Sequence, residues 1–202
     1  MNRKRFCLSA LFLTTIICYG QEKTETDIIN LTKITFLNPG ISYEHRIGKL
    51  QSLYFQAFMN TSAGVSYSSS FGWNSDIYFD PALTAQYRYY YNAKKRESKG
   101  KRTERNNLNY VAGISEITFS KSRVSTEHFN ELNRRAITNI GIAWGIQRNY
   151  NSRFSLDLNL GLGYLFTKAS KPDNQGQRTS IHFSQFTGLG QLNLGFWLNK
   201  RN

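Results

Sequence analysis

Residues 154–166 read FSLDLNLGLGYLF and alternate in polarity along almost their whole length. One parity is entirely apolar or aromatic: Phe154, Leu156, Leu158, Leu160, Leu162, Tyr164 and Phe166. The other parity is small or polar, with Ser155, Asp157, Asn159, Gly161 and Gly163, and only Leu165 interrupts it. Successive side chains of a strand point to opposite faces, whereas a helix would spread these leucines around its circumference. The stretch therefore predicts a β-strand with one wholly apolar face.

The same alternation recurs elsewhere in the chain. It is clear in residues 77–90, 136–147 and 191–198, and it is blurred in 53–60 because Tyr54 and Phe58 fall on the polar parity. Residues 108–119 are less regular, since Tyr110 and Ile114 oppose Val111 and Ile117. A β-bulge would explain that change of parity.

The connectors between these segments differ in length. Residues 48–49 and 149–152 are tight turns, whereas 67–76, 121–133 and 169–180 are longer and rich in Ser, Asn, Gly and charge. Outer-membrane barrels have short periplasmic turns and longer outer loops. If the tight turns are periplasmic, chain order puts 92–106 on the same side and requires a first strand within 28–37, followed by an outer turn at 38–40. The sequence thus predicts a closed eight-stranded antiparallel transmembrane β-barrel with both termini in the periplasm.

The N-terminal segment has the order of a secretory signal peptide. Arg3, Lys4 and Arg5 precede an apolar run, and Gly20 precedes the expected cleavage point. We therefore expect a signal peptide over 1–20 and a barrel domain over 21–202. Cleavage would remove both cysteines, Cys7 and Cys18, and with them disulfides, thiolate catalysis and cysteine metal sites. It would also leave 23 basic residues against 13 acidic ones, a net charge of +10.

The apolar parity of a closed barrel can face lipid or a protein core. A soluble periplasmic lipocalin-like carrier is therefore the alternative architecture. Its outer face would carry Lys, Glu, Thr and Gln, whereas here the polar parity is mostly Gly, Asn, Ser, Asp and Ala. Such small residues suit the crowded interior of an eight-stranded barrel better. We therefore expect lipid outside, and location in the outer membrane as a multi-pass protein.

Aromatic residues at both ends of the apolar stretches indicate two interfacial girdles. The step from residue 154 to 164 is about 33 Å along a strand, or roughly 25 Å across the membrane when tilted. Aromatic rings favour both edges of such a band. The expected girdle residues are Tyr87, Tyr89, Tyr150 and Phe154 on the periplasmic side and Tyr164 and Phe166 on the outer side. Ordinary aromatic core packing is the alternative interpretation.

Parity also predicts which charged side chains face the interior. These are Glu44, Arg46, Asp80, Arg88 and Asp157. Charges buried in a barrel need partners, so we expect a packed interior polar network. A gated or proton-conducting path through these charges is the functional alternative.

Two motifs resemble sequences of a known kind of protein. ISYEHRIGK at 41–49 gives a Tyr-Glu-Arg-like turn, and YRYYYNAKKRESKGKRTERNNLNY at 87–110 runs from a Tyr-rich strand through a basic turn into an Asn-Tyr strand. Together they resemble small, uncharacterised outer-membrane β-barrel proteins of the Bacteroidota, over most of residues 28–199. The resemblance implies outer-membrane location and no assigned activity, so it supplies no catalytic residue.

The remaining candidates for chemistry lie in connectors. The basic run Lys94 to Arg105 could contact anionic head groups or cell-wall polymer, or be a solvated turn; export argues against nucleic acid. His128 and His182, with Ser125, Glu127, Ser180 and Ser184 nearby, could form a rim hydrolase acting on envelope lipid. No nucleophile motif and no histidine pair with metal-ligand spacing accompanies them.

We therefore expect a structural, adhesive or small-solute role with no enzyme activity. We expect no cofactor and no metal, and we expect outer-membrane lipid and the barrel-assembly machinery as partners. A lipid-modifying barrel enzyme and the soluble carrier remain the alternatives.

Overall fold

The structure is a computed structural model that describes residues 26–68, 72–121, 133–172 and 178–200. It is all-β, with eight strands and one short helix in these ranges. The elements are β1 (Leu31–Leu37), β2 (Gly40–Gly48), β3 (Gln51–Ser68), β4 (Gly72–Tyr90), α2 (Ala93–Glu97), β5 (Asn109–Ser120), β6 (Arg135–Asn149), β7 (Phe154–Pro172) and β8 (Arg178–Trp197). The predicted number of strands is confirmed, including a first strand before residue 41.

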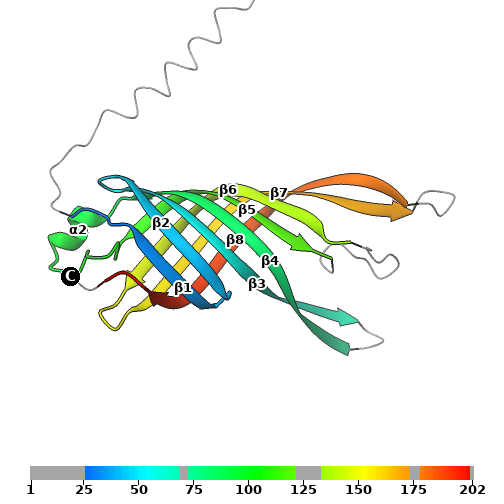
Figure 1. Cartoon of the computed structure of the whole chain (residues 1–202). Coiled ribbons are helices and arrows are strands. Elements are labelled where there is room, and N and C mark those ends of the chain that lie inside the picture. Colours follow the sequence, from blue (N-terminus) through cyan, green and yellow to red (C-terminus); the bar gives the residue numbers. More distant parts are fainter. Residues whose placement is uncertain (1–25, 69–71, 122–132, 173–177, 201–202) are drawn as a thin grey trace, which may run out of the picture.

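The strands form a closed ring (Figure 1). Each strand pairs antiparallel with the next in the chain, and β8 pairs with β1 through partners such as Lys33 and Trp197. Within the ring itself no edge of the sheet is left open, because β1 and β8 complete each other's hydrogen bonds. The antiparallel closed arrangement is therefore confirmed.

The two faces of the ring have opposite polarity. On β4, Leu83, Tyr87 and Tyr89 are exposed on the outside, whereas Thr84 and Arg88 are buried inside. The other strands repeat this arrangement, and Ile142 on β6 is 74% exposed. Tyr54 and Phe58, which blur the alternation of β3, are interior residues. The apolar parity thus faces outward over the central part of the ring.

The bulge suggested for residues 108–119 is absent. β5 keeps one register with β4 from Tyr110 to Thr118 and one with β6 from Asn109 to Ser120, and Ile114 faces inward. Within the described ranges, register shifts occur elsewhere, between Thr35 and Leu37 and between Arg46 and Gly48. An interior apolar side chain, rather than an extra residue, explains the irregular pattern.

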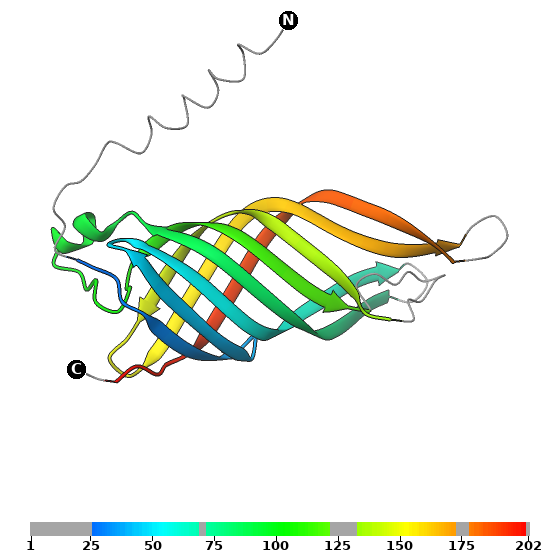
Figure 2. The same ribbon diagram turned by 45° about the horizontal axis from the view of Figure 1, so that its top comes forward.

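Two hairpins continue beyond the ring (Figure 2). β3 and β4 stay paired out to Ser68 and Gly72, although β4 pairs with β5 only from Ala82. β7 and β8 likewise stay paired out to Pro172 and Arg178. The long loops predicted at 67–76 and 169–180 are therefore wrong in part, because most of these residues are strand. Their Ser- and Asn-rich composition is compatible with a two-stranded ribbon, in which the two strands form backbone hydrogen bonds only with each other.

The opposite end of the ring carries the short connectors, α2 and both ends of the described chain (Figure 1). The turns β2–β3 and β6–β7 lie there with residues 92–106, as connector lengths predicted. This end is called the α2 end below, and the other the hairpin end. Of the helices in the described ranges, none has the length and apolarity needed to cross a bilayer. The expected signal peptide lies outside the described residues.

Candidate functional site

Four charged side chains lie inside the ring toward its α2 end. Lys33 on β1, Glu44 on β2, Arg88 on β4 and Asp157 on β7 are each no more than 2% exposed. Two are cationic and two anionic, so their formal charges cancel. We call these four residues the charged cluster.

Asp157 joins three strands within the charged cluster. Its Oδ2 lies 3.3 Å from Lys33 Nζ and 2.8 Å from Arg88 Nη1, and its Oδ1 accepts a 2.6 Å hydrogen bond from the Tyr110 hydroxyl. Charge-assisted bonds of this kind are the stronger ones in proteins. One carboxylate therefore compensates two buried cations.

Glu44 is held from the other side of the interior. It accepts hydrogen bonds from Ser52 Oγ at 2.7 Å, from Gln147 Nε2 at 3.0 Å and from the Tyr90 hydroxyl. The side-chain oxygen Oε1 of Gln147 in turn accepts hydrogen bonds from Lys33 at 3.1 Å and from Arg88 at 2.7 Å. Gln147 thus links the second carboxylate to both cations.

Two aromatic rings enclose the Arg88 guanidinium. Its Cζ lies 3.7 Å from the Tyr54 ring centroid and 4.2 Å from that of Tyr110. Stacking of a planar guanidinium between ring faces is favourable in a desolvated site. Its Nε donates to Gln86 Oε1 at 2.9 Å, which fixes the plane of the group.

A layer of amides lies next to the charged cluster, on the side of the hairpin end. Gln56 exchanges hydrogen bonds with Asn193 and accepts a further bond, at 3.2 Å, from Gln191. Tyr54 connects this layer to the cluster, because its hydroxyl donates to Gln56 at 3.0 Å. Beyond the layer, Phe58, Asn60 and other residues line a hollow of about 260 Å³.

Apolar packing covers the charged cluster at the α2 end. Ile28, Ala93 and Leu108 are fully buried against Tyr90 and Tyr110. The segment before β1 is fastened there by hydrogen bonds from Thr26 to Glu97 and from the Ile29 N–H to Asn106 Oδ1 at 2.8 Å. The chain therefore fills its interior from the amide layer to the α2 end.

The arrangement supports a structural role for the charged cluster. Every carboxylate and ammonium in it is bonded to a neighbour, and none has access to solvent. In the described residues, no group of three or more His, Asp or Glu could hold a metal ion. A buried cluster of paired charges with no net formal charge favours one packing arrangement of the interior.

The structure places four of the expected interior charges inside the ring. Glu44, Arg88 and Asp157 meet in one network, whereas Asp80 is buried nearer the hairpin end, where its Oδ2 has no hydrogen-bond partner among the described residues. The expectation for Arg46 is wrong. This residue lies at the rim beside a register shift, and its guanidinium pairs outside with Asp27, the two side chains being 46% and 41% exposed.

Lys33 is the interior charge that the sequence analysis missed. Lys33 has the same strand parity as Leu31 and Thr35, and Ile34 and Phe36 have the opposite, outward parity. The parity of Lys33 within this strand could therefore have predicted its inward orientation. The interior is also more aromatic than expected, with Tyr54, Tyr90 and Tyr110 fully buried. These rings fill space that small side chains would leave open.

The six expected girdle residues all lie on the outer face. Tyr87, Tyr89, Tyr150, Tyr164 and Phe166 are exposed, and Phe154 is half-buried. Four of them form two ring pairs: the ring centroids of Tyr150 and Phe154 are 5.9 Å apart, and those of Tyr164 and Phe166 are 6.3 Å apart. None of the six contributes to a buried core.

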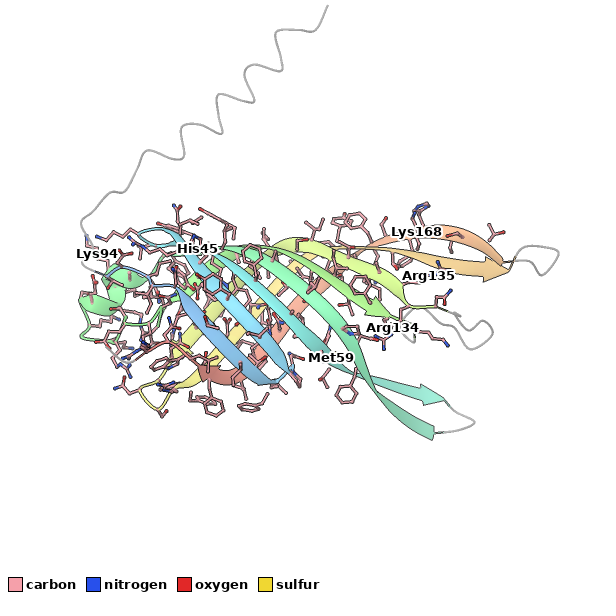
Figure 3. All side chains as sticks on the ribbon, in the orientation of Figure 1. His45, Met59, Lys94, Arg134, Arg135 and Lys168 are labelled. Atoms are coloured by element: carbon pink, nitrogen blue, oxygen red, sulfur yellow. The ribbon has the colours of Figure 1, made fainter. Side chains whose placement is uncertain are left out.

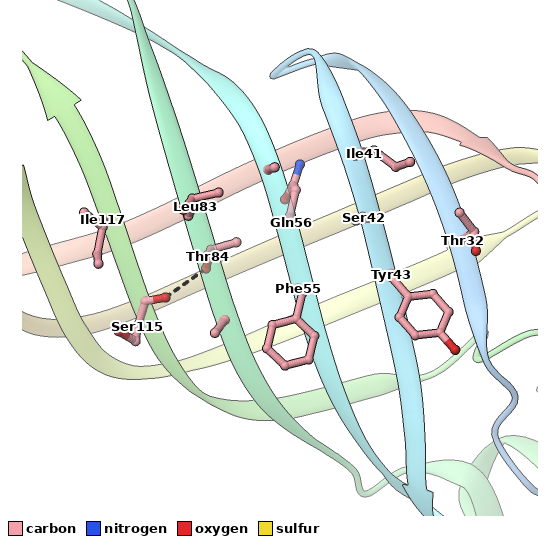
Figure 4. A pocket seen from close by; sticks show the side chains of 12 residues that line it. Thr32, Ile41, Ser42, Tyr43, Phe55, Gln56, Leu83, Thr84, Ser115 and Ile117 are labelled. Atoms are coloured by element: carbon pink, nitrogen blue, oxygen red, sulfur yellow. Dashed lines mark hydrogen bonds between the residues drawn. The ribbon is translucent and has the colours of Figure 1, made fainter.

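Shallow hollows mark the outer face of the ring. One of about 460 Å³ lies over β2, β3, β4 and β5, with Tyr43, Phe55 and Leu83 around it (Figure 4). Another of about 550 Å³ is lined by Tyr89, Trp144, Leu162 and neighbours. Both are walled mainly by apolar side chains from neighbouring strands.

The histidines considered for a rim hydrolase are not brought together by any described contact. His182 is exposed on β8 opposite Lys168, and His128, Ser125 and Glu127 lie outside the described residues. His45 lies on the outer face, where its ring stacks on Tyr43 at 6.2 Å (its place is labelled in Figure 3). The hydrolase interpretation therefore gains no geometric support from the described part of the chain.

No protein-family model, curated protein or solved structure matches this chain. The resemblance of residues 41–49 and 87–110 to Bacteroidota barrels therefore stays a prediction from those two motifs.

Proposed function

We propose that this chain is an integral outer-membrane β-barrel protein whose filled ring serves as a structural or adhesive anchor. In this proposal the α2 end and both termini face the periplasm, and the two long hairpins extend from the cell surface. The barrel-assembly machinery would insert it. The observation that carries the proposal is the inverted polarity of the ring, apolar outside and charged inside.

The outer face is difficult to reconcile with water. Ile142, Phe186 and Leu162 are 74%, 61% and 56% exposed, and many further large apolar side chains accompany them. Soluble monomers rarely expose contiguous apolar patches larger than a few hundred Å². Acyl chains would cover this face, and the shallow hollows in it would accommodate them.

The apolar outer face also ends where a membrane boundary is expected. On β7 the outward side chains are apolar up to Phe166, and Lys168 is the next outward residue. On β8 the last outward aromatic side chain is Phe186, and Ser184 and His182 follow it toward the hairpin end. Lys168 lies past the ring on the projecting hairpin in Figure 3. Toward the α2 end, Tyr87, Tyr89 and Tyr150 mark the other limit. Aromatic and then charged residues are the usual order at bilayer interfaces.

The interior favours an anchor over a carrier or a channel. A lipocalin-like carrier needs an apolar cavity inside the ring, yet Lys33, Glu44, Arg88 and Asp157 occupy that space. A small-solute channel needs a continuous path, and the amide layer and the apolar cover fill the cross-section. The structural or adhesive role is therefore the better supported of the roles considered.

Carbonate extraction and heat-modifiability test the membrane part of this proposal. Membranes from cells that express the full chain are washed with alkaline carbonate, and the retained protein is compared on gels with and without boiling. Retention with a shift in mobility on boiling is the expected result. Release by carbonate, and solubility without detergent, would overturn the proposal and favour the soluble carrier.

Epitope insertion tests the orientation. A tag between residues 172 and 178 should bind antibody on intact cells, whereas a tag in the β6–β7 turn should bind only after the outer membrane is permeabilised. The reverse labelling pattern would contradict the proposed orientation while leaving membrane insertion intact.

A further inference from the structure

The connector between β4 and β5 forms a basic pocket at the α2 end. It has a volume of about 290 Å³. Its lining consists of Tyr91, Asn92, Lys95, Arg96, Lys99, Lys101, Asn109 and Arg148. Five of these residues are cationic, and no carboxylate is among them. We call this hollow the basic pocket.

The acidic residues of the connector are engaged elsewhere. Glu97 accepts hydrogen bonds from Thr26 on the segment before β1. Glu104 lies 3.8 Å from Arg102 and 3.9 Å from Arg105, neither of which lines the basic pocket. The positive charge of the pocket is therefore not neutralised by its own connector.

The two arginines of the basic pocket are fixed by neutral acceptors. Arg96 donates through Nε and Nη2 to the Arg102 carbonyl at 3.1 and 2.8 Å. Arg148 donates to the Leu108 carbonyl at 3.0 Å and to Asn109 Oδ1 at 2.7 Å. Partial burial lowers the pKa of Arg96 from its ordinary value, although a guanidinium stays charged at neutral pH. Both cations are thus held in place without a counter-charge.

The three lysines of the basic pocket supply mobile donors. Within the described part of the chain, no hydrogen bond or ion pair involves the ammonium groups of Lys95, Lys99 and Lys101. Each ammonium offers three donors on a flexible stem, which suits the tetrahedral oxygens of a phosphate.

The location of the basic pocket indicates that a phosphate bound there would belong to a lipid head group. Tyr91 lines it and accepts a 2.6 Å hydrogen bond from Trp144 Nε1, and both rings are exposed on the outer face. Tyr87 and Tyr89, two of the expected girdle residues, precede Tyr91 on the same outward parity. The basic pocket therefore adjoins the edge of the apolar outer face, where lipid phosphates lie if the ring is in a bilayer.

We propose that the basic pocket binds the head group of an anionic phospholipid in the leaflet at the α2 end. Lys95, Lys99 and Lys101 contact the phosphate, Arg96 and Arg148 supply a fixed positive field, and the acyl chains lie against Tyr91 and Trp144. This inference rests on the proposed membrane location. It assigns the general expectation for the basic run 94–105, contact with anionic head groups or cell-wall polymer, to one lipid-binding pocket.

Native mass spectrometry of the full mature chain in a neutral detergent tests this site. Phosphatidylglycerol, phosphatidylcholine, inorganic phosphate and a soluble anionic peptidoglycan fragment are added separately. The test variant is K95Q/K99Q/K101Q. The matched control K49Q/K94Q/K200Q removes the same charge from the same end outside the pocket, and heat-modifiability is measured for every protein.

The wild-type chain and the control should retain phosphatidylglycerol in preference to phosphatidylcholine, and the test variant should bind it about tenfold more weakly or worse. Equal retention by all three proteins, or equal loss in both variants, overturns the site. Binding of the peptidoglycan fragment or of free phosphate without phosphatidylglycerol overturns the lipid assignment. A failed membrane location would appear instead in the carbonate wash, which does not depend on these lysines.

Discussion

The carboxylate of Asp157 forms ion pairs with both cations of the charged cluster. It faces Lys33 and Arg88 at 3.3 and 2.8 Å, and both cations are as buried as the carboxylate itself. A different ion pair, between Arg46 on β2 and Asp27, lies at the rim and is half exposed. The two sites therefore allow the same chemical change to be compared in opposite surroundings.

Asp157→Asn should destabilise the folded ring by about 3–5 kcal/mol, because it leaves two buried cations with a single remaining carboxylate. Asp27→Asn removes an exposed pair and should cost roughly 1 kcal/mol or less. Urea unfolding of the mature chain refolded in lipid vesicles, followed by tryptophan fluorescence, measures both. Equal midpoints for Asp157→Asn and wild type would contradict the role given to the charged cluster.

Gly145 provides a second test at a single residue. A Cβ at this position on β6 would lie 2.2 Å from Tyr110 Cζ, whose ring is fully buried, whereas a Cβ at Gly113 meets nothing within 4 Å. Gly145→Ala should push Tyr110 off Asp157 and cost about 1–3 kcal/mol. Gly113→Ala should be neutral or slightly stabilising, because alanine loses less backbone entropy on folding. Equal unfolding midpoints for the two variants would contradict the close packing of the Tyr110 ring against Gly145.

Among the elements, β7 shows most clearly the difference in polarity between the outer and inner faces of the ring. Its outward side chains are apolar from Phe154 to Phe166, and its inward ones meet the charged cluster at Asp157. Beyond Thr167, where pairing with β6 ends, it continues as a hairpin with β8 alone. One strand thus contains both the proposed lipid-facing band and its limit.

Leu160→Lys should lower the stability of the vesicle-inserted protein by about 2–4 kcal/mol, because a cation would lie near the bilayer midplane. His182→Lys places the same cation past Phe166 and Phe186 and should cost about 0–1 kcal/mol. Folding in vesicles and in detergent micelles is compared for each variant. If Leu160→Lys is as stable as His182→Lys in vesicles, the outer face does not contact lipid there.

The same strand shows how far element prediction could go. Alternation located β7 from its first residue, because period two is a local property of extended chain. Its end at Pro172 was not predicted, since Ser, Lys and Asn are typical of loops and also occur in exposed ribbons. The β5 pattern was misjudged for a related reason: an apolar residue such as Ile114 can fill a barrel interior as well as an outer face.

For the whole molecule, the filled cross-section has a direct consequence. From the α2 end toward the hairpin end, the apolar cover at Ile28 and Leu108, the charged cluster and the amide layer follow one another along the ring. Ions crossing it would have to displace buried, paired groups. A barrel of this size has room for side chains rather than for a water column.

The purified protein inserted in a planar bilayer should therefore show no steady ionic conductance. A general porin reconstituted in the same way serves as the positive control. Insertion of the test protein is verified separately by protease protection, so that absence of current is informative. Reproducible single-channel currents would contradict the sealed interior and favour the small-solute role.

The sequence alone determined the architecture of this protein and the faces of its strands. Alternation indicated most of the strands and connector lengths indicated their number. Closure into a ring was predicted on the expectation of lipid outside, where an open strand edge would find no hydrogen-bond partner. These features depend on short-range geometry and on side-chain polarity, both of which are visible in the chain.

Only the tertiary structure decided which interior residues meet. Lys33 bonds to Asp157 across 124 positions, and Arg46, inward by parity, leaves the interior to pair with Asp27. The register between neighbouring strands sets which side chains share a layer, and register is a property of the closed ring rather than of any one strand. The partners of the charged cluster, the basic pocket and the projecting hairpins therefore became apparent only once all eight strands were paired.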